Sequence, residues 1–139
     1  MIGADADGLD FKGNPPASEA DIRAFELQSG IKLPADYVQF LKRMNGGEGF
    51  VGGGYVIIYP IEKLLENNRG YRFEEYVPEL FLFGSNGGGE AFAFDRRTKD
   101  WSVVMVPFIP LDLKEANAVA ACFDALFEAL WNRYPPDPD

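Results

Sequence analysis

The chain has 139 residues, 47% of them hydrophobic and 14% aromatic, and its 22 acidic and 13 basic side chains give a formal net charge of −9. This length and apolar content predict one folded domain with a buried core, and the negative charge argues against nucleic acid or an anionic membrane as partner. With no histidine and one cysteine, the sequence excludes histidine-based catalytic pairs, histidine-ligated zinc and an internal disulfide.

The two ends of the chain differ in composition from its middle. Residues 1–17 are rich in Gly, Asp and Pro, which predicts a flexible N-terminal segment there, one domain over 18–134 and a frayed tail at 135–139. The first residues lack the basic and apolar regions of a signal peptide, and no apolar run approaches the roughly 20 residues of a membrane helix. The single cysteine indicates a reducing compartment, so we expect a cytoplasmic protein.

A first helix is expected to begin after Ser18, a suitable N-cap, with Asp21 three positions later as the acidic half of a capping box. Ile22 and Phe25 would give this helix its buried side. Gly30 is expected to end it, because glycine adopts the left-handed conformation of a helix C-cap without strain.

A second helix is expected within the segment Leu33–Gly47, LPADYVQFLKRMNGG. Pro34 suits the start of a helix, since its φ is already helical and it has no amide hydrogen to leave unpaired. Tyr37, Leu41 and Met44 then fall on one apolar face. The Asn-Gly-Gly that follows tolerates the left-handed region and predicts the end of the helix.

The middle of the chain has the composition of short strands separated by turns. The strands are rich in Val, Ile, Met and aromatic residues, and Gly, Pro or charged residues interrupt them. A polar excursion at 67–79 and a charged turn at 95–100 also lie in this region. The expected strands are Tyr55–Tyr59, Leu80–Phe83, Ala91–Phe94 and Trp101–Val106.

The last predicted helix covers Glu115–Asn132. Apolar residues fall on one side of it at helical spacing, whereas Asp124 and Glu128 fall on the other. Cys122 lies on the apolar side, so we expect its thiol to be buried. Helices, then strands, then a final helix predict an α+β domain whose helices pack on an antiparallel or mixed sheet.

Three segments resemble motifs of one known family. Leu33–Gly47 is similar to the opening L-P-x-D-Y motif of the SUKH superfamily, the Smi/Knr-like domains. Phe83–Asp95, FGSNGGGEAFAFD, resembles their central strand–glycine turn–strand element, and Ala120–Leu130 resembles their closing helix. The resemblance implies one α+β domain, with two N-terminal helices and a C-terminal helix packed on a twisted sheet of five or six strands.

The resemblance also implies a function. Bacterial members of the superfamily are immunity proteins that bind the cognate domain of a secreted toxin in the cytoplasm, whereas larger fungal relatives regulate cell-wall synthesis as interaction scaffolds. Because this chain has little beyond the core domain, the resemblance favours an immunity protein, with a regulatory scaffold as the alternative. We separately expect a monomer or a weak dimer. The acidity fits a basic toxin such as a nuclease, because opposite charges speed association.

The residues themselves offer little catalytic chemistry. Gly84–Gly89, GSNGGG, is followed by Glu90 and a strand instead of the lysine and helix start of a phosphate-binding loop, so we interpret it as a turn. Glu48, Glu90 and Asp95 leave open a carboxylate-based hydrolase, which needs two carboxyl groups about 5–10 Å apart. We predict no catalytic, metal-binding or cofactor-binding residue.

Surface recognition is the function that the residue pattern favours. Loops on a rigid sheet commonly carry binding residues, and aromatic side chains are frequent interface anchors. The alternative for each aromatic residue, taken singly, is that it covers the edge of the sheet. The predicted protein-binding residues are Glu48, Phe50, Tyr55, Tyr71, Phe73, Tyr76, Asn86 and Glu90.

Overall fold

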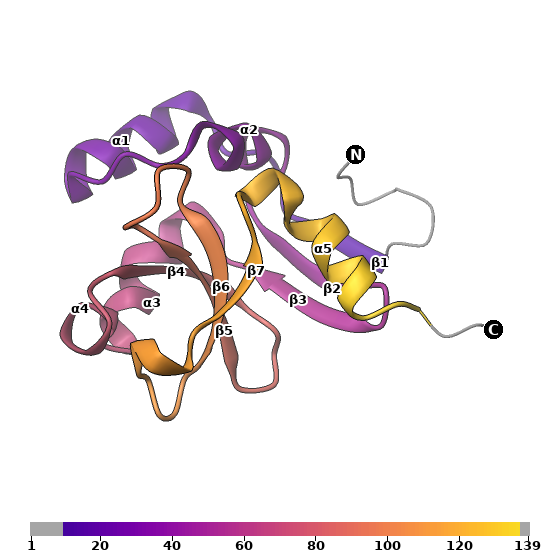
Figure 1. Ribbon diagram of the computed structural model, residues 1–139. Coiled ribbons are helices and arrows are strands. Elements are labelled where there is room, and N and C mark those ends of the chain that lie inside the picture. The colour runs from indigo at the N-terminus through magenta and orange to yellow at the C-terminus, as the bar shows by residue number, and fades with distance from the viewer. Residues whose placement is uncertain (1–9, 137–139) are drawn as a thin grey trace.

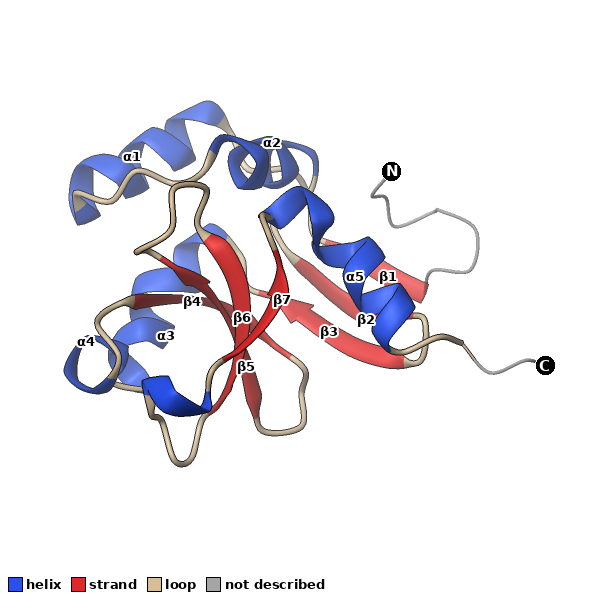
Figure 2. Cartoon of the chain, viewed as in Figure 1, coloured by secondary structure: helices blue, strands red, loops and turns tan. Residues whose placement is uncertain are grey.

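Seven strands form one antiparallel sheet, and each strand pairs with its neighbours in sequence (Figures 1 and 2). The computed structural model describes residues 10–136. It confirms the predicted α+β class, with seven strands in place of the expected five or six. The strands are β1 (Asp10–Gly13), β2 (Gly47–Val51), β3 (Gly54–Ile58), β4 (Leu80–Ser85), β5 (Glu90–Asp95), β6 (Ser102–Pro107) and β7 (Asn117–Ala120).

Helical segments precede, interrupt and follow this sheet. In Figure 1, α1 and α2 lie together at one end of the molecule, and α5 crosses beside β1 and β2. The helices are α1 (Glu19–Ser29), α2 (Ala35–Arg43), α3 (Leu64–Gly70), α4 (Phe73–Tyr76) and α5 (Leu126–Arg133), and the 3-10 turns are η1 (Ile61–Lys63), η2 (Leu113–Glu115) and η3 (Phe123–Ala125).

The two faces of the sheet carry separate apolar cores. In β4, Phe81 and Phe83 belong to the larger core and Leu80 and Leu82 to the smaller one, as the alternation of side chains along a strand requires. The larger core includes residues of α1, α2 and α5. The smaller core includes Phe73 of α4 but no described residue of β1, β2 or β3. The second face of the sheet is therefore open over these three strands.

Tyr37 of α2 lies at the centre of the larger core. Its ring centroid is 5.7 Å from that of Phe83 in β4, 5.1 Å from that of Phe94 in β5 and 5.1 Å from that of Phe123 in η3. Its hydroxyl is buried and has no hydrogen-bond partner among residues 10–136. Burial raises the pKa of this phenol, because the phenolate would lose its hydration. One side chain thus joins α2, the sheet and the C-terminal segment.

A hydrogen bond from the start of α2 supports the same junction. The Oδ2 atom of Asp36 accepts from the backbone N–H of Asp124 at 2.9 Å, across 88 residues of sequence. Asp124 lies in η3, from which α5 continues directly, so the bond satisfies an amide that the helix itself leaves unpaired. The L-P-x-D-Y segment therefore positions the C-terminal helix as well as beginning α2.

The sequence signals at both ends of α1 are confirmed. Ser18 Oγ accepts from the Asp21 amide at 3.0 Å, and Asp21 Oδ2 accepts from the Ser18 amide at 3.1 Å, which completes a capping box. Gly30 ends the helix with φ 73°, in the left-handed region. These local signals need no tertiary contact to be effective, which is why the sequence alone predicted them.

The prediction of a flexible segment over residues 1–17 is wrong from residue 10 onward. Asp10–Gly13 form β1, which pairs with β2, and both Phe11 and Ala17 are buried. Pairing with a strand distant in sequence gives this short segment a structure that its own composition does not predict. Residues 1–9 and 137–139 lie outside the described residues.

The helix predicted over Glu115–Asn132 is wrong in its first half. Asn117–Ala120 form β7, and α5 begins only at Leu126. Main-chain pairing with β6 outweighs the helical spacing of the apolar residues here. Cys122 precedes the helix and is half-buried, so the prediction of a buried thiol on a helix face is wrong as well.

The segment expected as a polar excursion, 67–79, contains the end of α3 and all of α4. Asn68 of α3 is buried, and its side chain forms hydrogen bonds with the main chain of β4, as a neighbouring strand would. Its Nδ2 donates to the carbonyl of Leu82 at 3.0 Å, and its Oδ1 accepts from the Leu82 amide at 2.9 Å. Since β3 pairs with β4 only at Ile57 and Ile58, this side chain satisfies main-chain groups that β3 leaves unpaired.

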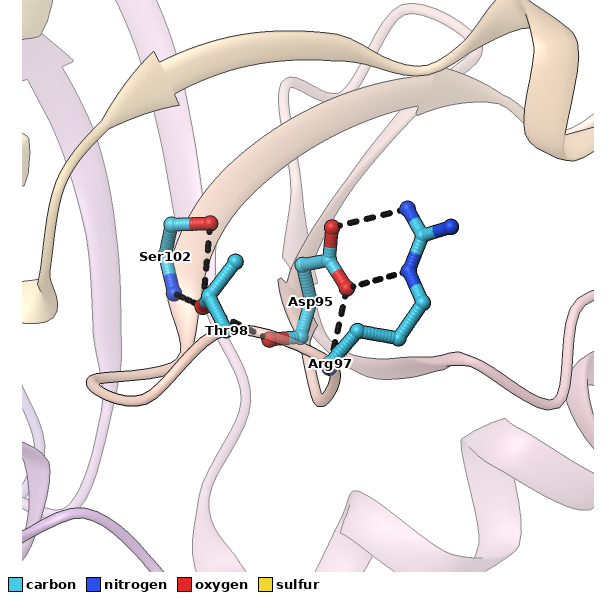
Figure 3. A network of polar contacts seen from close by, with 4 residues as sticks. All are labelled: Asp95, Arg97, Thr98 and Ser102. Atoms are coloured by element: carbon cyan, nitrogen blue, oxygen red, sulfur yellow. Dashed lines mark hydrogen bonds and ion pairs between the residues drawn. The ribbon is translucent and has the colours of Figure 1, made fainter.

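The charged turn predicted at 95–100 is confirmed as the hairpin between β5 and β6 (Figure 3). The Asp95 carboxylate accepts from Arg97 Nε at 2.9 Å and from its Nη2 at 3.0 Å. These bonds hold the pKa of Asp95 below its ordinary range. Thr98 Oγ1 accepts from the Ser102 amide at 2.8 Å and closes the turn.

We predict that Leu41→Ala lowers the free energy of unfolding by about 2–5 kcal/mol, because it leaves a cavity in the larger core. Leu41 is 0% exposed, whereas Leu27 in α1 is 79% exposed. Leu27→Ala is therefore the matched control and should change this free energy by less than about 0.5 kcal/mol. Denaturant unfolding measures both values, and equal effects would show that the buried face of α2 is wrongly assigned.

Candidate functional site

The strand register brings several of the predicted binding residues onto the open half of the second face. Glu48 and Phe50 in β2 lie directly opposite Ile57 and Tyr55 in β3, and Lys12 in β1 lies opposite Glu48 on its other side. Directly opposed residues point to the same face of a sheet. Glu48 and Phe50 are the exposed positions in the alternating pattern of β2. These five residues form what we call the open sheet face.

The rings of Phe50 and Tyr55 pack edge to face on this surface, with their centroids 5.0 Å apart. Phe50 is 46% exposed and so presents apolar area to solvent. The Tyr55 hydroxyl donates a hydrogen bond to Oε2 of Glu48. This bond raises the pKa of Tyr55, because ionisation of the phenol would break it and place two negative charges side by side.

The glycine-rich turn between β4 and β5 adjoins Tyr55. Asn86 organises the turn, since its Oδ1 accepts from the amides of Gly88 at 2.8 Å and Glu90 at 3.1 Å. Its Nδ2 donates to Oε1 of Glu90 at 3.3 Å. Gly87 has φ 75°, and a Cβ atom there would lie 3.3 Å from Cδ2 of Tyr55. The turn therefore lies against the Tyr55 ring, with an amide and a carboxylate beside it.

Phe108 continues this surface beyond the turn. Its amide donates to the carbonyl of Gly89 at 3.0 Å, and its ring centroid lies 4.3 Å from that of Tyr71. Tyr71 is 46% exposed, and Ile109, next to Phe108, is 91% exposed. Sequence reasoning missed Phe108 because it lies in the irregular segment after β6. Its signal in the sequence is the apolar pair Phe108-Ile109 between two prolines, in a stretch that forms no predicted element.

Two ring pairs thus lie on either side of the glycine turn, Phe50 with Tyr55 and Phe108 with Tyr71. Gly87 leaves no room for a side chain larger than hydrogen without crowding Tyr55, and the carbonyl of Gly89 accepts from the amide of Phe108. We call Phe50, Tyr55, Phe108 and Tyr71, with the turn at 86–89 between them, the aromatic row. It joins two β-hairpins to the α3–α4 turn. The predicted binding residues that lie on the row or beside it are Glu48, Phe50, Tyr55, Tyr71, Asn86 and Glu90.

Two of the predicted binding residues do not join this surface. Phe73 is 1% exposed and packs in the smaller core, so its assignment to a binding surface is wrong. It lies on the buried side of α4, within the segment 67–79 that the sequence predicts as a polar excursion. Tyr76, at the end of the same helix, is 52% exposed, but none of the ring contacts described above includes it.

The structure separates two of the three carboxylates considered for a catalytic pair. Glu90 and Asp95 occupy opposite ends of β5, which places them about 17 Å apart at the rise of an antiparallel strand. Asp95 is also bound by Arg97 in the hairpin turn (Figure 3). These two carboxylates therefore do not flank one scissile bond at the separation of about 5–10 Å that glycoside hydrolysis needs.

Among residues 10–136, no helix has the length and apolar character to cross a membrane. In the same residues, acidic and cysteine side chains do not gather in groups of three or more, as ligands of a metal ion would. The aromatic row is the surface of the described chain on which exposed rings and polar loop groups come together.

The sequence matches a protein family over most of its length. The model of the SMI1 / KNR4 family (SUKH-1) matches residues 16–129. The matched range contains the L-P-x-D-Y segment and every residue of the aromatic row. A comparison with curated proteins gave no match.

We predict that Glu48→Gln lowers the pKa of Tyr55 toward its ordinary value of 10.0. The neutral amide is a weaker acceptor than the carboxylate, so the hydrogen bond that raises this pKa is weakened, and the charge repulsion that opposes ionisation of the phenol is removed. The bond is lost as pH rises through the pKa of Tyr55, so in the variant it is lost at a lower pH. A pH titration of the Tyr55 ring carbon resonance by NMR measures this shift. Glu66→Gln is the control, because Glu66 lies in α3 and pairs with Lys63. An unchanged pKa in Glu48→Gln would contradict the assigned bond.

Proposed function

The chain belongs to the SMI1 / KNR4 family (SUKH-1), and from this membership we propose that it is a protein-binding domain that binds and neutralises a cognate bacterial toxin. The proposed contact surface is the aromatic row. The resemblance to a superfamily whose bacterial members are immunity proteins supports a toxin as partner and the cytoplasm as the place of binding. The domain acts by binding the toxin and blocking its activity, and it carries out no reaction of its own.

The single observation that carries this proposal is the aromatic row itself. It consists of two pairs of contacting rings, Phe50 with Tyr55 and Phe108 with Tyr71, and one ring of each pair, Phe50 and Tyr71, is 46% exposed. Ile109 adds a side chain that is 91% exposed. Aromatic residues are enriched at the centres of protein interfaces, where a few anchors supply most of the binding free energy. A monomer gains nothing in stability from exposing such rings together.

The row is also preorganised for binding. The ring of Tyr55 is held by Glu48, and the turn beside it is held by the three hydrogen bonds of the Asn86 side chain. The amide of Phe108 is bonded to the turn. Side chains that are already ordered lose little conformational entropy on association, so more of their contact energy appears as affinity.

Charge supports a basic partner. The protein carries a formal net charge of −9, and Glu48 and Glu90 flank the aromatic row. Opposite charge on the toxin would steer the encounter and raise the association rate, an effect that salt screens over roughly 8–10 Å. Raising the salt concentration should therefore slow association more than it accelerates dissociation.

The regulatory scaffold remains the second candidate, because the same surface would serve an endogenous partner. The gene neighbourhood separates the two, since an immunity protein is encoded beside its toxin. Co-expression with the toxin-like protein encoded next to this gene is the direct test. Protection of the cells together with a stable complex supports the immunity function, whereas a normal toxic effect and no complex would contradict it and favour the scaffold.

We predict that Phe50→Ala and Tyr71→Ala each weaken binding to the neutralised toxin by tenfold or more, which corresponds to about 1.4 kcal/mol. Both side chains are about half exposed, so their removal should leave the thermal midpoint nearly unchanged. Surface plasmon resonance measures the affinity, and thermal unfolding measures the stability.

Leu27→Ala is the control for this experiment, because Leu27 is a highly exposed apolar residue on α1, outside the aromatic row. It should leave the affinity unchanged. Affinities of Phe50→Ala and Tyr71→Ala that equal the parent value would show that the aromatic row is not the contact surface.

Double replacement of Glu48 and Glu90 by Gln should lower the association rate, whereas Glu128→Gln in α5 should not.

A further inference from the structure

A second surface feature lies at the junction of α1, α3 and the start of β4. It is a cavity of about 380 Å³, within the size range of small-molecule sites. None of the residues of the aromatic row lines it. Three arginines do, namely Arg69, Arg72 and Arg96. We call this cavity the arginine pocket.

The three arginines come from separate elements. Arg69 is in the last turn of α3, Arg72 lies between α3 and α4, and Arg96 directly follows β5. Arg72 has φ 61°, a left-handed conformation that is uncommon for a residue with a side chain. The guanidinium of Arg96 lies 5.8 Å from the centroid of the Trp101 ring, which restricts its orientation. Three arginines thus line one cavity in a chain whose net charge is −9.

Ion pairs within the protein neutralise little of the charge of these guanidinium groups. Arg72 approaches Glu75 at 3.8 Å, an exposed ion pair that contributes little. Among residues 10–136, the side chains of Arg69 and Arg96 form no ion pair or hydrogen bond with another side chain. Glu74 and Glu75 also line the pocket, so its charge is not purely positive. Three guanidinium groups still outnumber these two carboxylates and leave donors free for an anion.

Apolar side chains complete the arginine pocket. Ile31, Leu65 and Phe81 contribute to its lining. Phe81 is almost fully buried in the larger core, and its ring packs on those of Phe25 and Trp101, so this part of the wall is rigid. A ligand that fills the cavity therefore needs an apolar part as well as an anionic one.

We propose that the arginine pocket binds a phosphate monoester of a molecule that also contains an aromatic ring. A phosphate dianion offers three acceptor oxygens, which matches several planar guanidinium forks better than one carboxylate does. The aromatic part would lie against Leu65 and Phe81. A phosphate monoester and an aromatic ring occur together in a phosphorylated tyrosine side chain, where the ring carries the phosphate, and in a nucleoside monophosphate, where ribose lies between them. The experiment below distinguishes these two sources.

The test uses the full chain and phenyl phosphate, followed by NMR through the arginine Nε–Hε resonances. We expect saturable binding with shifts at Arg69 and Arg96. Inorganic phosphate and phenol should each bind more weakly, because each supplies only half of the interaction. Phosphotyrosine and adenosine 5′-monophosphate are then compared, and the tighter of the two identifies the source.

Arg69→Gln and Arg96→Gln should each weaken the binding of phenyl phosphate by tenfold or more. Arg43→Gln is the matched control, because Arg43 is an exposed arginine at the end of α2, outside the pocket, and the change in net charge is the same. Thermal midpoints verify that the variants are folded. Absence of saturable binding, or equal affinities in Arg69→Gln, Arg96→Gln and Arg43→Gln, would overturn the proposal. Since no toxin is involved, its failure leaves the function proposed for the aromatic row unaffected.

Discussion

The packing of Tyr37 against three phenylalanine rings is the contact on which the rest of the structure depends. It brings α2, the central strands and the C-terminal segment together, and the hydrogen bond that the Asp124 amide donates to Asp36 stabilises the edge of the same junction. Because α1, α2 and α5 all contribute to the core on this side, the opposite face of β1, β2 and β3 is left without a helix. The aromatic row occupies that uncovered region and extends across the glycine turn.

Local signals predicted those elements whose structure is decided within a few residues. The capping box at Ser18, the end of α1 at Gly30 and the hairpin turn at 95–100 are of this kind. Two strands that have no strand-like sequence of their own, and form through pairing with another strand, were not predicted. The strand Asp10–Gly13 exists because β2 lies beside it, and its backbone approaches Gly49 so closely that a Cβ there would collide with the carbonyl oxygen of Asp10. The strand Asn117–Ala120 likewise depends on β6.

The same distinction explains how much of the candidate site could be predicted. Glu48, Phe50 and Tyr55 lie in one hairpin, so alternation along two strands suffices to place them together. Phe108 joins them only through the glycine turn, from a part of the chain about 50 residues later, which no local pattern indicates. Phe73 was misplaced because α4 buries it, and a four-residue helix is too short to show a periodicity in sequence.

In the proposed function, the open side of the sheet binds the partner and the helical side only supports it. Hydrogen–deuterium exchange of the free protein, and of its complex with the toxin proposed as its partner, distinguishes the two sides. We expect slower exchange in β2, β3 and the turn at 86–89 on binding, with no change in α1. Protection confined to α1 and α2, with unchanged exchange at the turn, would contradict the proposal.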